Sequence, residues 1–239
     1  MLLSSKEKFI FIHIPKTAGT SIKLALKPYE TKKPSDFTQD QNLLKFIKER
    51  PDRLKEKGMV FPNHMGIWDI DKRMTLDLNQ FTTFTIIRNP WARFLSLYKH
   101  YQRDPMHPYY KQANEYDLKG FANFIINKQS SSPSVDSLPQ VNYLIDKSGK
   151  VKINYLLKFE MLEQALDILS KELGLKPIKL SKINASPQSH NYLKEYDTEA
   201  WKLISEFEKG IIELGKYSNS QKEQQSTHSI IKIQNSEEK

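Results

Sequence analysis

One lysine, one glycine and three hydroxyl residues stand together directly after an apolar run near the start of this 239-residue chain. The apolar run is Phe9–Ile14, and the polar segment after it is Pro15-Lys-Thr-Ala-Gly-Thr-Ser21. A strand that passes into a helix through such a loop directs free backbone N–H groups, and the positive end of the helix dipole, toward a ligand. Lys16 adds a full positive charge. The segment therefore predicts a site for a phosphate or sulfate ester.

This loop differs from two common phosphate-binding loops. A Walker loop has Gly-x-x-x-x-Gly-Lys-Ser/Thr, whereas here Lys16 precedes Gly19 by three residues. The dinucleotide fingerprint needs three closely spaced glycines, and the eight glycines of the chain do not cluster in that way. Taken alone, the segment is also compatible with a polar turn that begins a helix, with a serine or threonine as its N-cap.

A second apolar, β-branched run meets a helix pattern at residues 81–98. Arg88 stands at the end of the predicted strand, Pro90 suits the first turn of a helix, and Ser96 follows two turns later. Arginine offers a planar charged fork to phosphate oxygens, and a serine hydroxyl adds a hydrogen bond. Ligands of open α/β sheets collect beyond the carboxyl ends of the strands. One nucleotide with two separated phosphates would satisfy both segments.

The two segments together resemble the sulfotransferases that use 3′-phosphoadenosine 5′-phosphosulfate (PAPS). The nearest resemblance is to the bacterial type of the carbohydrate and polysaccharide branch, sulfotransferase family 2. The first segment is similar to its "hIPKTAGTS" signature, and the second to its "RNPxxRxxSxY" motif. The resemblance runs from about residue 8 to about residue 217. It includes Gln140–Gly149, Lys158–Leu162, Leu173–Leu175 and Asn184–Ser186.

The resemblance implies a role for each matching residue. The residues that would hold the 5′-phosphosulfate are Lys16, Thr17, Ala18, Gly19, Thr20 and Ser21. Arg88 and Ser96 would hold the 3′-phosphate, and Asn184 and Ser186 would lie near the adenine. Lys16 would also stabilise the charge that builds on the leaving phosphate. Arg93 and Tyr98 are expected to brace the helix rather than touch the nucleotide.

A general base must take the proton of the attacking hydroxyl, and His64 is the predicted base. Its expected loop, Phe61–Ile70, resembles a "GHxxxxDF"-like segment of relatives that use a histidine, although Asn63 replaces the glycine. Asp69 and Asp71 follow His64 and are alternatives that could orient it or replace it. His13, inside the first apolar run, is expected to have a structural role.

Composition narrows the class of protein. The chain has no cysteine, which excludes disulfides and thiolate chemistry, and its six histidines show no metal-ligand spacing, so no metal is expected. No signal peptide and no membrane-spanning run is recognised, so a cytoplasmic enzyme is expected. The net charge of +9 would attract PAPS, an anionic glycan or anionic lipid headgroups. Nucleic-acid binding is an alternative, but no nucleic-acid-binding motif is found, and no nucleic acid is expected as a partner.

The organisation predicted from the sequence is α/β. A single domain over residues 1–217, with a central parallel sheet flanked by helices as in P-loop nucleotide kinases, would be followed by a disordered tail at 218–239. Helices are expected near 19–27, in the second strand–helix unit at 82–102, from Phe121, at 161–173 with Gly174 as the cap, and from Asp197 onward; 129–134 should be a loop. The predicted reaction is sulfuryl transfer from PAPS to a carbohydrate or glycolipid hydroxyl. A kinase or other phosphotransferase, and a nucleotide-binding protein without catalysis, are the alternatives.

Overall fold

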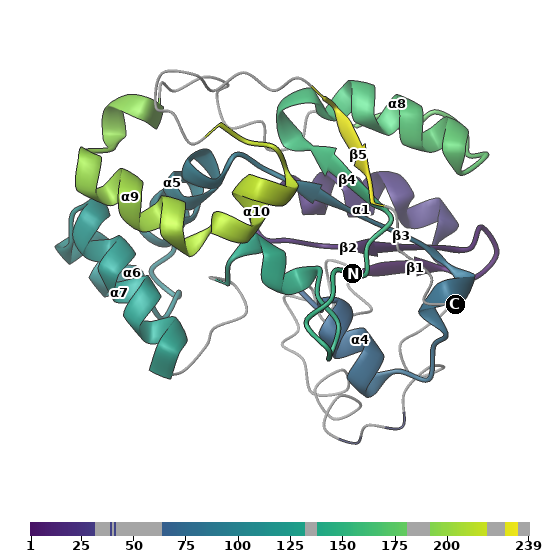
Figure 1. Cartoon of the computed structure of the whole chain (residues 1–239), viewed down its shortest axis with the longest axis horizontal. Helices are drawn as coiled ribbons and strands as arrows, with labels where there is room; N and C mark the ends of the chain where they lie inside the picture. The colour runs from purple at the N-terminus through teal and green to yellow at the C-terminus, as the bar shows by residue number, and fades with distance from the viewer. Residues whose placement is uncertain are drawn as a thin grey trace.

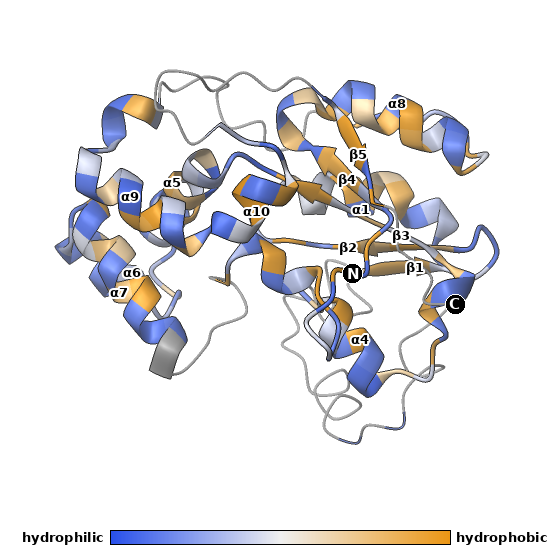
Figure 2. Ribbon diagram, in the orientation of Figure 1, coloured by the Kyte–Doolittle hydropathy of each residue, from blue (hydrophilic) through white to orange (hydrophobic). Residues whose placement is uncertain are grey.

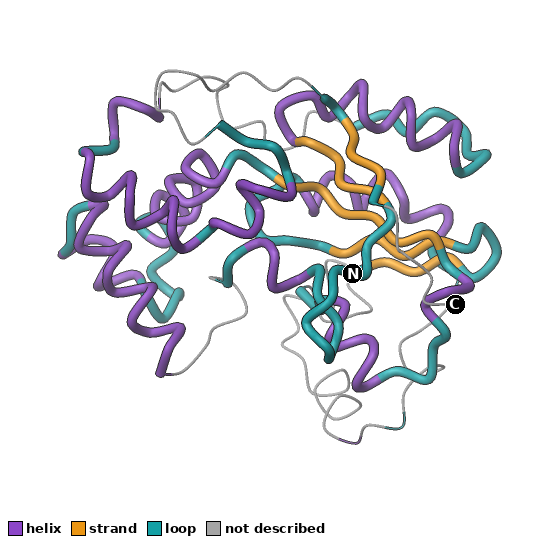
Figure 3. Tube along the Cα trace, viewed as in Figure 1, coloured by secondary structure: helices purple, strands orange, loops and turns teal. Residues whose placement is uncertain are grey.

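A single five-stranded sheet forms the centre of the described structure (Figures 1 and 3). The structure is a computed structural model, and it describes residues 1–31, 39, 41, 64–131, 138–180, 192–218 and 228–233. The strands are β1 (Leu2–Ser4), β2 (Phe9–Ile12), β3 (Thr82–Ile87), β4 (Tyr155–Lys158) and β5 (Ile230–Lys232), and they are neighbours in this order.

The three inner strands, β2, β3 and β4, run parallel, while β1 and β5 pair antiparallel at the two edges. The predicted α/β fold with a central parallel sheet is therefore confirmed for the inner strands. All four residues of β2 are buried, as expected for a strand that is covered on both faces. The register pairs Ile12 with Thr85 and Ile87 with Lys158, so the three carboxyl ends meet at one edge of the sheet.

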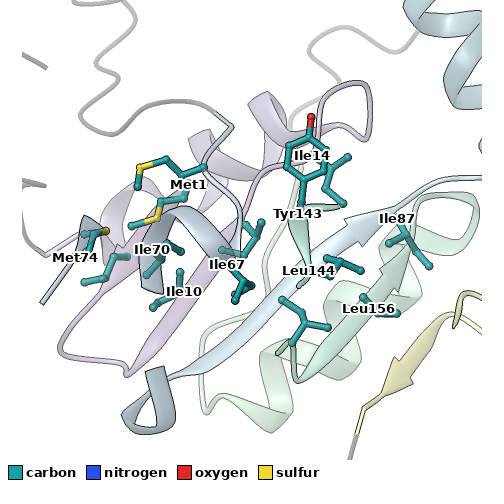
Figure 4. Close-up of a cluster of buried hydrophobic side chains, with 14 of the residues drawn as sticks. Met1, Ile10, Ile14, Ile67, Ile70, Met74, Ile87, Tyr143, Leu144 and Leu156 are labelled. Carbon is teal, nitrogen blue, oxygen red and sulfur yellow. The ribbon is translucent and has the colours of Figure 1, made fainter. Parts of the chain in front are cut away.

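Helices cover both faces of the sheet. One face packs against α1 (Gly19–Leu26) and α8 (Leu162–Glu172). The other face packs against α4 (Ile67–Arg73), the 3₁₀ turn η5 (Gln140–Tyr143) and α10 (Lys209–Leu214). Figure 4 shows this second cluster, in which Ile67 and Ile70 of α4 lie near Ile10 of β2. Apolar residues colour much of the sheet orange in Figure 2, whereas blue and orange segments alternate along the outer helices.

A group of four helices lies beyond the carboxyl ends of β2 and β3, at the left of Figure 1. Its members are α5 (Pro90–Tyr101), α6 (Tyr110–Glu115), α7 (Leu118–Ser131) and α9 (Thr198–Phe207). They share one buried cluster in which the rings of Trp91 and Trp201 stack at 3.9 Å. This helical group forms the wall that faces the carboxyl edge of the sheet. Within the described ranges, no helix is long and apolar enough to span a lipid bilayer.

Several local predictions are confirmed. Pro90 is the first residue of α5, and the Asn89 side chain caps that helix by accepting a hydrogen bond from Ala92 N at 3.1 Å. Asp197 caps α9 through Ala200 N at 2.7 Å. Gly174, with φ +64°, ends α8, and the hydrogen bonds from Leu175 N to Ser170 O and from Gly174 N to Lys171 O complete a Schellman motif.

Three local predictions are wrong. The expected tail contains β5, because the β-branched residues Ile230 and Ile231 can pair with the free edge of β4. The expected loop at 129–134 begins too early, since α7 continues through Ser131. The last helix is two helices, α9 and α10, separated at Glu208, whose buried carboxylate is held by other parts of the chain. Most of the segment 28–57 lies outside the described residues.

Candidate functional site

The loop between β2 and α1 has an uncommon backbone. Lys16 has φ +67° and Ala18 has φ +63°, both in the left-handed region that residues other than glycine seldom adopt. Such alternation arranges successive N–H groups as an anion-binding concavity, and strain of this kind is concentrated at functional sites. The alternative of a serine or threonine N-cap is not found: Ala18 is the N-cap of α1, and no side chain caps the helix. Because Ala18 has no side-chain acceptor, the N-terminus of α1 can bind a ligand instead of a cap.

The side chains of this loop divide into two kinds. Thr17 is fully buried, and its hydroxyl donates a 2.8 Å hydrogen bond to Ile14 O, so this side chain holds the loop and only its backbone can face a ligand. Lys16 is half-buried, and Thr20 is exposed. Burial, together with the nearby positive charges of Arg88 and Arg103, lowers the pKa of Lys16 to about 8. A cation with this environment gains from the arrival of an anion.

Arg88 brings the second predicted segment into contact with the first. It follows β3 directly, and its Nη1 donates a hydrogen bond to Lys16 O at 3.1 Å. Its guanidinium lies 4.4 Å above the ring of Phe159, the first residue after β4. Arg88 Nε is buried and has no hydrogen-bond partner among the described residues. An unpaired buried donor on a charged group is costly, so this side chain can bind an acceptor that the described residues do not supply.

Ser96 lies half-buried on α5, three residues after Arg93, and its hydroxyl makes no hydrogen bond to another described residue. The structure thus joins Arg88 to the Lys16 loop by a direct bond but does not join Ser96 to either. Asn184 and Ser186 lie outside the described residues.

His64 contacts the segment that leads from β2 into the Lys16 loop. Its Nδ1 is 3.1 Å from His13 O, and its ring centroid is 4.6 Å from that of His13, the residue directly after β2. A carbonyl oxygen only accepts, so Nδ1 of His64 carries the proton and Nε2 of the neutral ring has the lone pair. The segment is less of a loop than expected, because α4 begins at Ile67.

The two carboxylates considered as alternative bases have other contacts. Asp69 Oδ2 accepts a hydrogen bond from Gly66 N at 3.2 Å, which caps α4, and Oδ1 lies 3.4 Å from Arg73 Nε. Asp71 pairs with Lys147 at 3.8 Å. These contacts indicate a role in holding the helix that follows His64.

Arg93 braces the loop from inside the protein, whereas the sequence predicts that it braces its own helix. It is fully buried, and its three donors reach Pro15 O at 3.1 Å, Glu208 Oε1 at 2.7 Å and Leu138 O at 3.1 Å. Glu208 Oε2 also accepts from Gln140 N at 2.9 Å. Burial raises the pKa of Glu208, and the Arg93 guanidinium opposes that rise. The guanidinium thus fixes the residue immediately before Lys16.

Gln140 and Glu160 are site residues that the sequence analysis did not single out. Gln140 forms two reciprocal hydrogen bonds of 2.9 Å with the backbone N and O of Arg88. Glu160 Oε1 accepts from Asn89 N at 2.6 Å, and its Oε2 accepts from the Tyr217 hydroxyl at 3.1 Å. Both residues orient the Arg88 turn through its backbone. The available signal was their place in the segments 140–149 and 158–162, which match the family pattern.

The carboxyl end of β4 supplies a third cation. Lys158 is fully buried, its Nζ lies 4.6 Å above the ring of Tyr217, and it has no hydrogen-bond partner among the described residues. Burial lowers its pKa. Lys16, Arg88 and Lys158 thus follow or end three adjacent parallel strands, so three cations gather at this edge of the sheet, and the charge of Glu160 is felt by Arg88 and Lys158. Among the described residues, no group of three or more histidine, aspartate or glutamate side chains is placed to hold a metal ion.

Comparison with known proteins agrees with this geometry. A model of the sulfotransferase family matches residues 1–232, which includes the three inner strands, both predicted anion-binding segments and β5. No curated protein and no solved structure matched the chain. The match covers nearly the whole sequence, and it confirms the family that the two motifs predict. The chain therefore belongs to family 2 of the sulfotransferases and is a transferase of the sulfotransferase class.

Proposed function

We propose that the protein transfers the sulfuryl group of PAPS to a hydroxyl of a carbohydrate-type acceptor. The observation that carries this proposal is the hydrogen bond from Arg88 Nη1 to Lys16 O, 3.1 Å long, because it joins two anion-binding segments into one site. A donor with phosphate groups at both its 5′ and 3′ positions needs two such segments. A mononucleotide with a single phosphate cluster needs only one.

The residues present fit such a donor. Arg88 Nε has no hydrogen-bond partner among the described residues, although the negative charge of Glu160 is felt by this guanidinium, and Lys16 is half-buried. Lys16 and the backbone N–H groups from Thr17 to Ser21 would bind the 5′-phosphosulfate. Arg88 and Ser96 would bind the 3′-phosphate, with Asn184 and Ser186 near the adenine. PAPS supplies an activated sulfuryl group with a phosphate as its leaving group.

His64 would act as the general base through Nε2. The acceptor oxygen forms a bond to sulfur, the bond from sulfur to the 5′-phosphate oxygen breaks, and the hydroxyl proton passes to His64. Lys16 would stabilise the charge that builds on the departing phosphate, since a preorganised cation acts most strongly where charge develops. The hydrogen bond from His64 Nδ1 to His13 O holds the ring so that Nε2 is the basic atom.

The positive charge of the chain supports an acceptor that carries acidic groups. A net charge of +9 attracts anionic groups over a distance, so a carbohydrate or glycolipid acceptor with acidic groups, or one presented at an anionic membrane surface, fits the protein. The same charge would also serve a nucleotide kinase, but no feature of the site favours ATP over a nucleotide with a 3′-phosphate.

The affinity for adenosine 3′,5′-bisphosphate, the expected product, should fall as the pH rises through about 8, because Lys16 loses its proton there in the free protein. Binding of the anion favours the protonated form, so the loss appears on the alkaline side and not below neutral pH. Calorimetric titration at several pH values measures this. Lys16→Arg is the matched control, since arginine keeps its charge over this range and should remove the dependence. An equal alkaline loss in Lys16→Arg would contradict the assignment.

Discrimination by the 3′-phosphate tests the proposal itself. Wild-type protein should bind PAPS at least about tenfold more tightly than adenosine 5′-phosphosulfate, which lacks the 3′-phosphate, because charge-assisted hydrogen bonds to arginine contribute about 1.5–3 kcal/mol. Arg88→Ala should remove most of this difference. Arg103→Ala is the control, since Arg103 is an exposed cation whose charge is felt at Lys16. If Arg88→Ala weakened both nucleotides equally, Arg88 would not read the 3′-phosphate.

A further inference from the structure

The imidazole of His13 lies between the two parts of the site that must act together. It is 6% exposed and follows β2 directly. On one side its ring is 4.6 Å from the ring of His64, at an angle of 55°. On another side it stacks on Phe11 at 6.1 Å. From the sequence alone, this histidine is expected to have only a structural role.

His13 also explains why residue 19 is a glycine. A Cβ on Gly19 would lie 1.7 Å from Cδ2 and 2.0 Å from Nε2 of His13, which is a severe overlap. The backbone of Gly19 does not require glycine, since the glycines with positive φ are Gly149 and Gly174. The His13 ring therefore packs directly against the first residue of α1, where the loop between β2 and α1 ends. We call this loop, residues 15–19, the donor loop.

The polar atoms of the ring are not used to hold it. Nδ1 of His13 is buried and has no hydrogen-bond partner among the described residues. Burial keeps the pKa of His13 well below its usual value, and the nearby His64, N-terminus, Lys23 and Lys16 lower it further. The ring is thus neutral and makes its contacts through its flat surface and its edge.

We propose that His13 is a positioning residue whose ring sets the distance and orientation between the base His64 and the donor loop at Gly19. This inference rests on the proposed function, in which His64 is the base and the loop that ends at Gly19 binds the donor. The His13 carbonyl fixes which nitrogen of His64 is protonated, and the His13 ring supports the plane of the His64 ring. The same ring fills the space beside Gly19, so one residue fixes the position of the base relative to the loop that would bind the sulfuryl donor.

A double-mutant cycle tests the contact with the loop. Gly19→Ala alone should weaken binding of adenosine 3′,5′-bisphosphate by about 10- to 100-fold, because the added methyl group overlaps the His13 ring and displaces the loop. His13→Ala should change this affinity little, because Arg93 still holds the loop. His13→Ala with Gly19→Ala should restore binding to within about threefold of His13→Ala, since the added methyl group then has room. A double variant that binds as weakly as Gly19→Ala would overturn the proposal.

Nitrogen NMR of the His64 side chain tests the contact with the base and needs no nucleotide. Wild-type protein should show His64 with the proton on Nδ1. His13→Ala keeps the backbone carbonyl that accepts from His64 Nδ1, so the proton should stay on Nδ1, but loss of the neighbouring ring should shift and broaden the His64 nitrogen signals. His13→Phe, which keeps a flat ring, should retain the wild-type signal. Ile12→Ala is the control for lost stability, because Ile12 packs in the cluster on the opposite face. An unchanged His64 signal in folded His13→Ala would overturn the proposal. Failure of the wild-type protein to bind the bisphosphate would instead count against the proposed function.

Discussion

Replacing His64 with alanine should lower kcat for sulfuryl transfer by about 10²- to 10⁴-fold while changing the affinity for the bisphosphate by no more than about twofold. The reason is that His64 would touch the acceptor proton and not the nucleotide. Its Nδ1 is already bonded to His13 O, which leaves Nε2 as the basic atom. The measurement is the release of adenosine 3′,5′-bisphosphate from PAPS in the presence of a panel of acidic oligosaccharides.

Asp69→Asn is the matched control for this experiment. Asp69 caps α4 through Gly66 N, so its loss should cost about 1 kcal/mol of stability and leave the chemical step nearly unchanged. The opposite pattern, in which Asp69→Asn abolishes turnover and His64→Ala does not, would show that a carboxylate is the base.

Replacing Arg93 with methionine should lower the free energy of unfolding by about 3–5 kcal/mol, because it leaves a charged group buried without its partner. Arg93 and Glu208 are both fully buried and lie 2.7 Å apart. The variant also loses the donors to Pro15 O and Leu138 O. Urea denaturation followed by circular dichroism gives the change in unfolding free energy.

The loss in Arg93→Met should be smaller at low pH. Without Arg93, the carboxyl of Glu208 would have a pKa in the folded state that is raised further above its unfolded value, since burial already raises it. A group of this kind contributes stability below its unfolded pKa that is lost as the pH rises through its folded pKa. Lys171→Ala is the control, because its pair with Asp167 is exposed and contributes less than about 0.5 kcal/mol. Equal effects of the two substitutions would contradict the role of the buried pair.

The sequence predicted the parts of the site that depend on local pattern. The apolar run before Pro15, the proline at the start of α5 and the cap residue Asp197 each act over a few residues, and the structure places them as expected. The family motifs added which residues should bind the donor. The direct bond between Arg88 and Lys16 joins residues 72 positions apart, and only the parallel pairing of β2 with β3 brings them together.

The missed features depend on contacts between distant segments. Glu208 reads as one more acidic residue of an exposed helix, yet it is buried because Arg93, 115 residues earlier, meets it in the core. The strands β1 and β5 have three residues each, which is too short for an alternating pattern, and they form because the edges of β2 and β4 offer unpaired backbone groups. Nothing in the sequence links His13 to Gly19, and only the overlap that a Cβ at residue 19 would make with the His13 ring shows that they constrain each other.

Calorimetric titration of the purified wild-type protein with adenosine 3′,5′-bisphosphate, beside ATP, tests the central claim most directly. The claim is that Lys16 and Arg88 form one site for a nucleotide with separated 5′ and 3′ phosphates. We predict that the bisphosphate binds at least about tenfold more tightly than ATP, since one additional charge-assisted contact corresponds to this ratio. Equal binding, or tighter binding of ATP, would contradict the claim and indicate a phosphotransferase site.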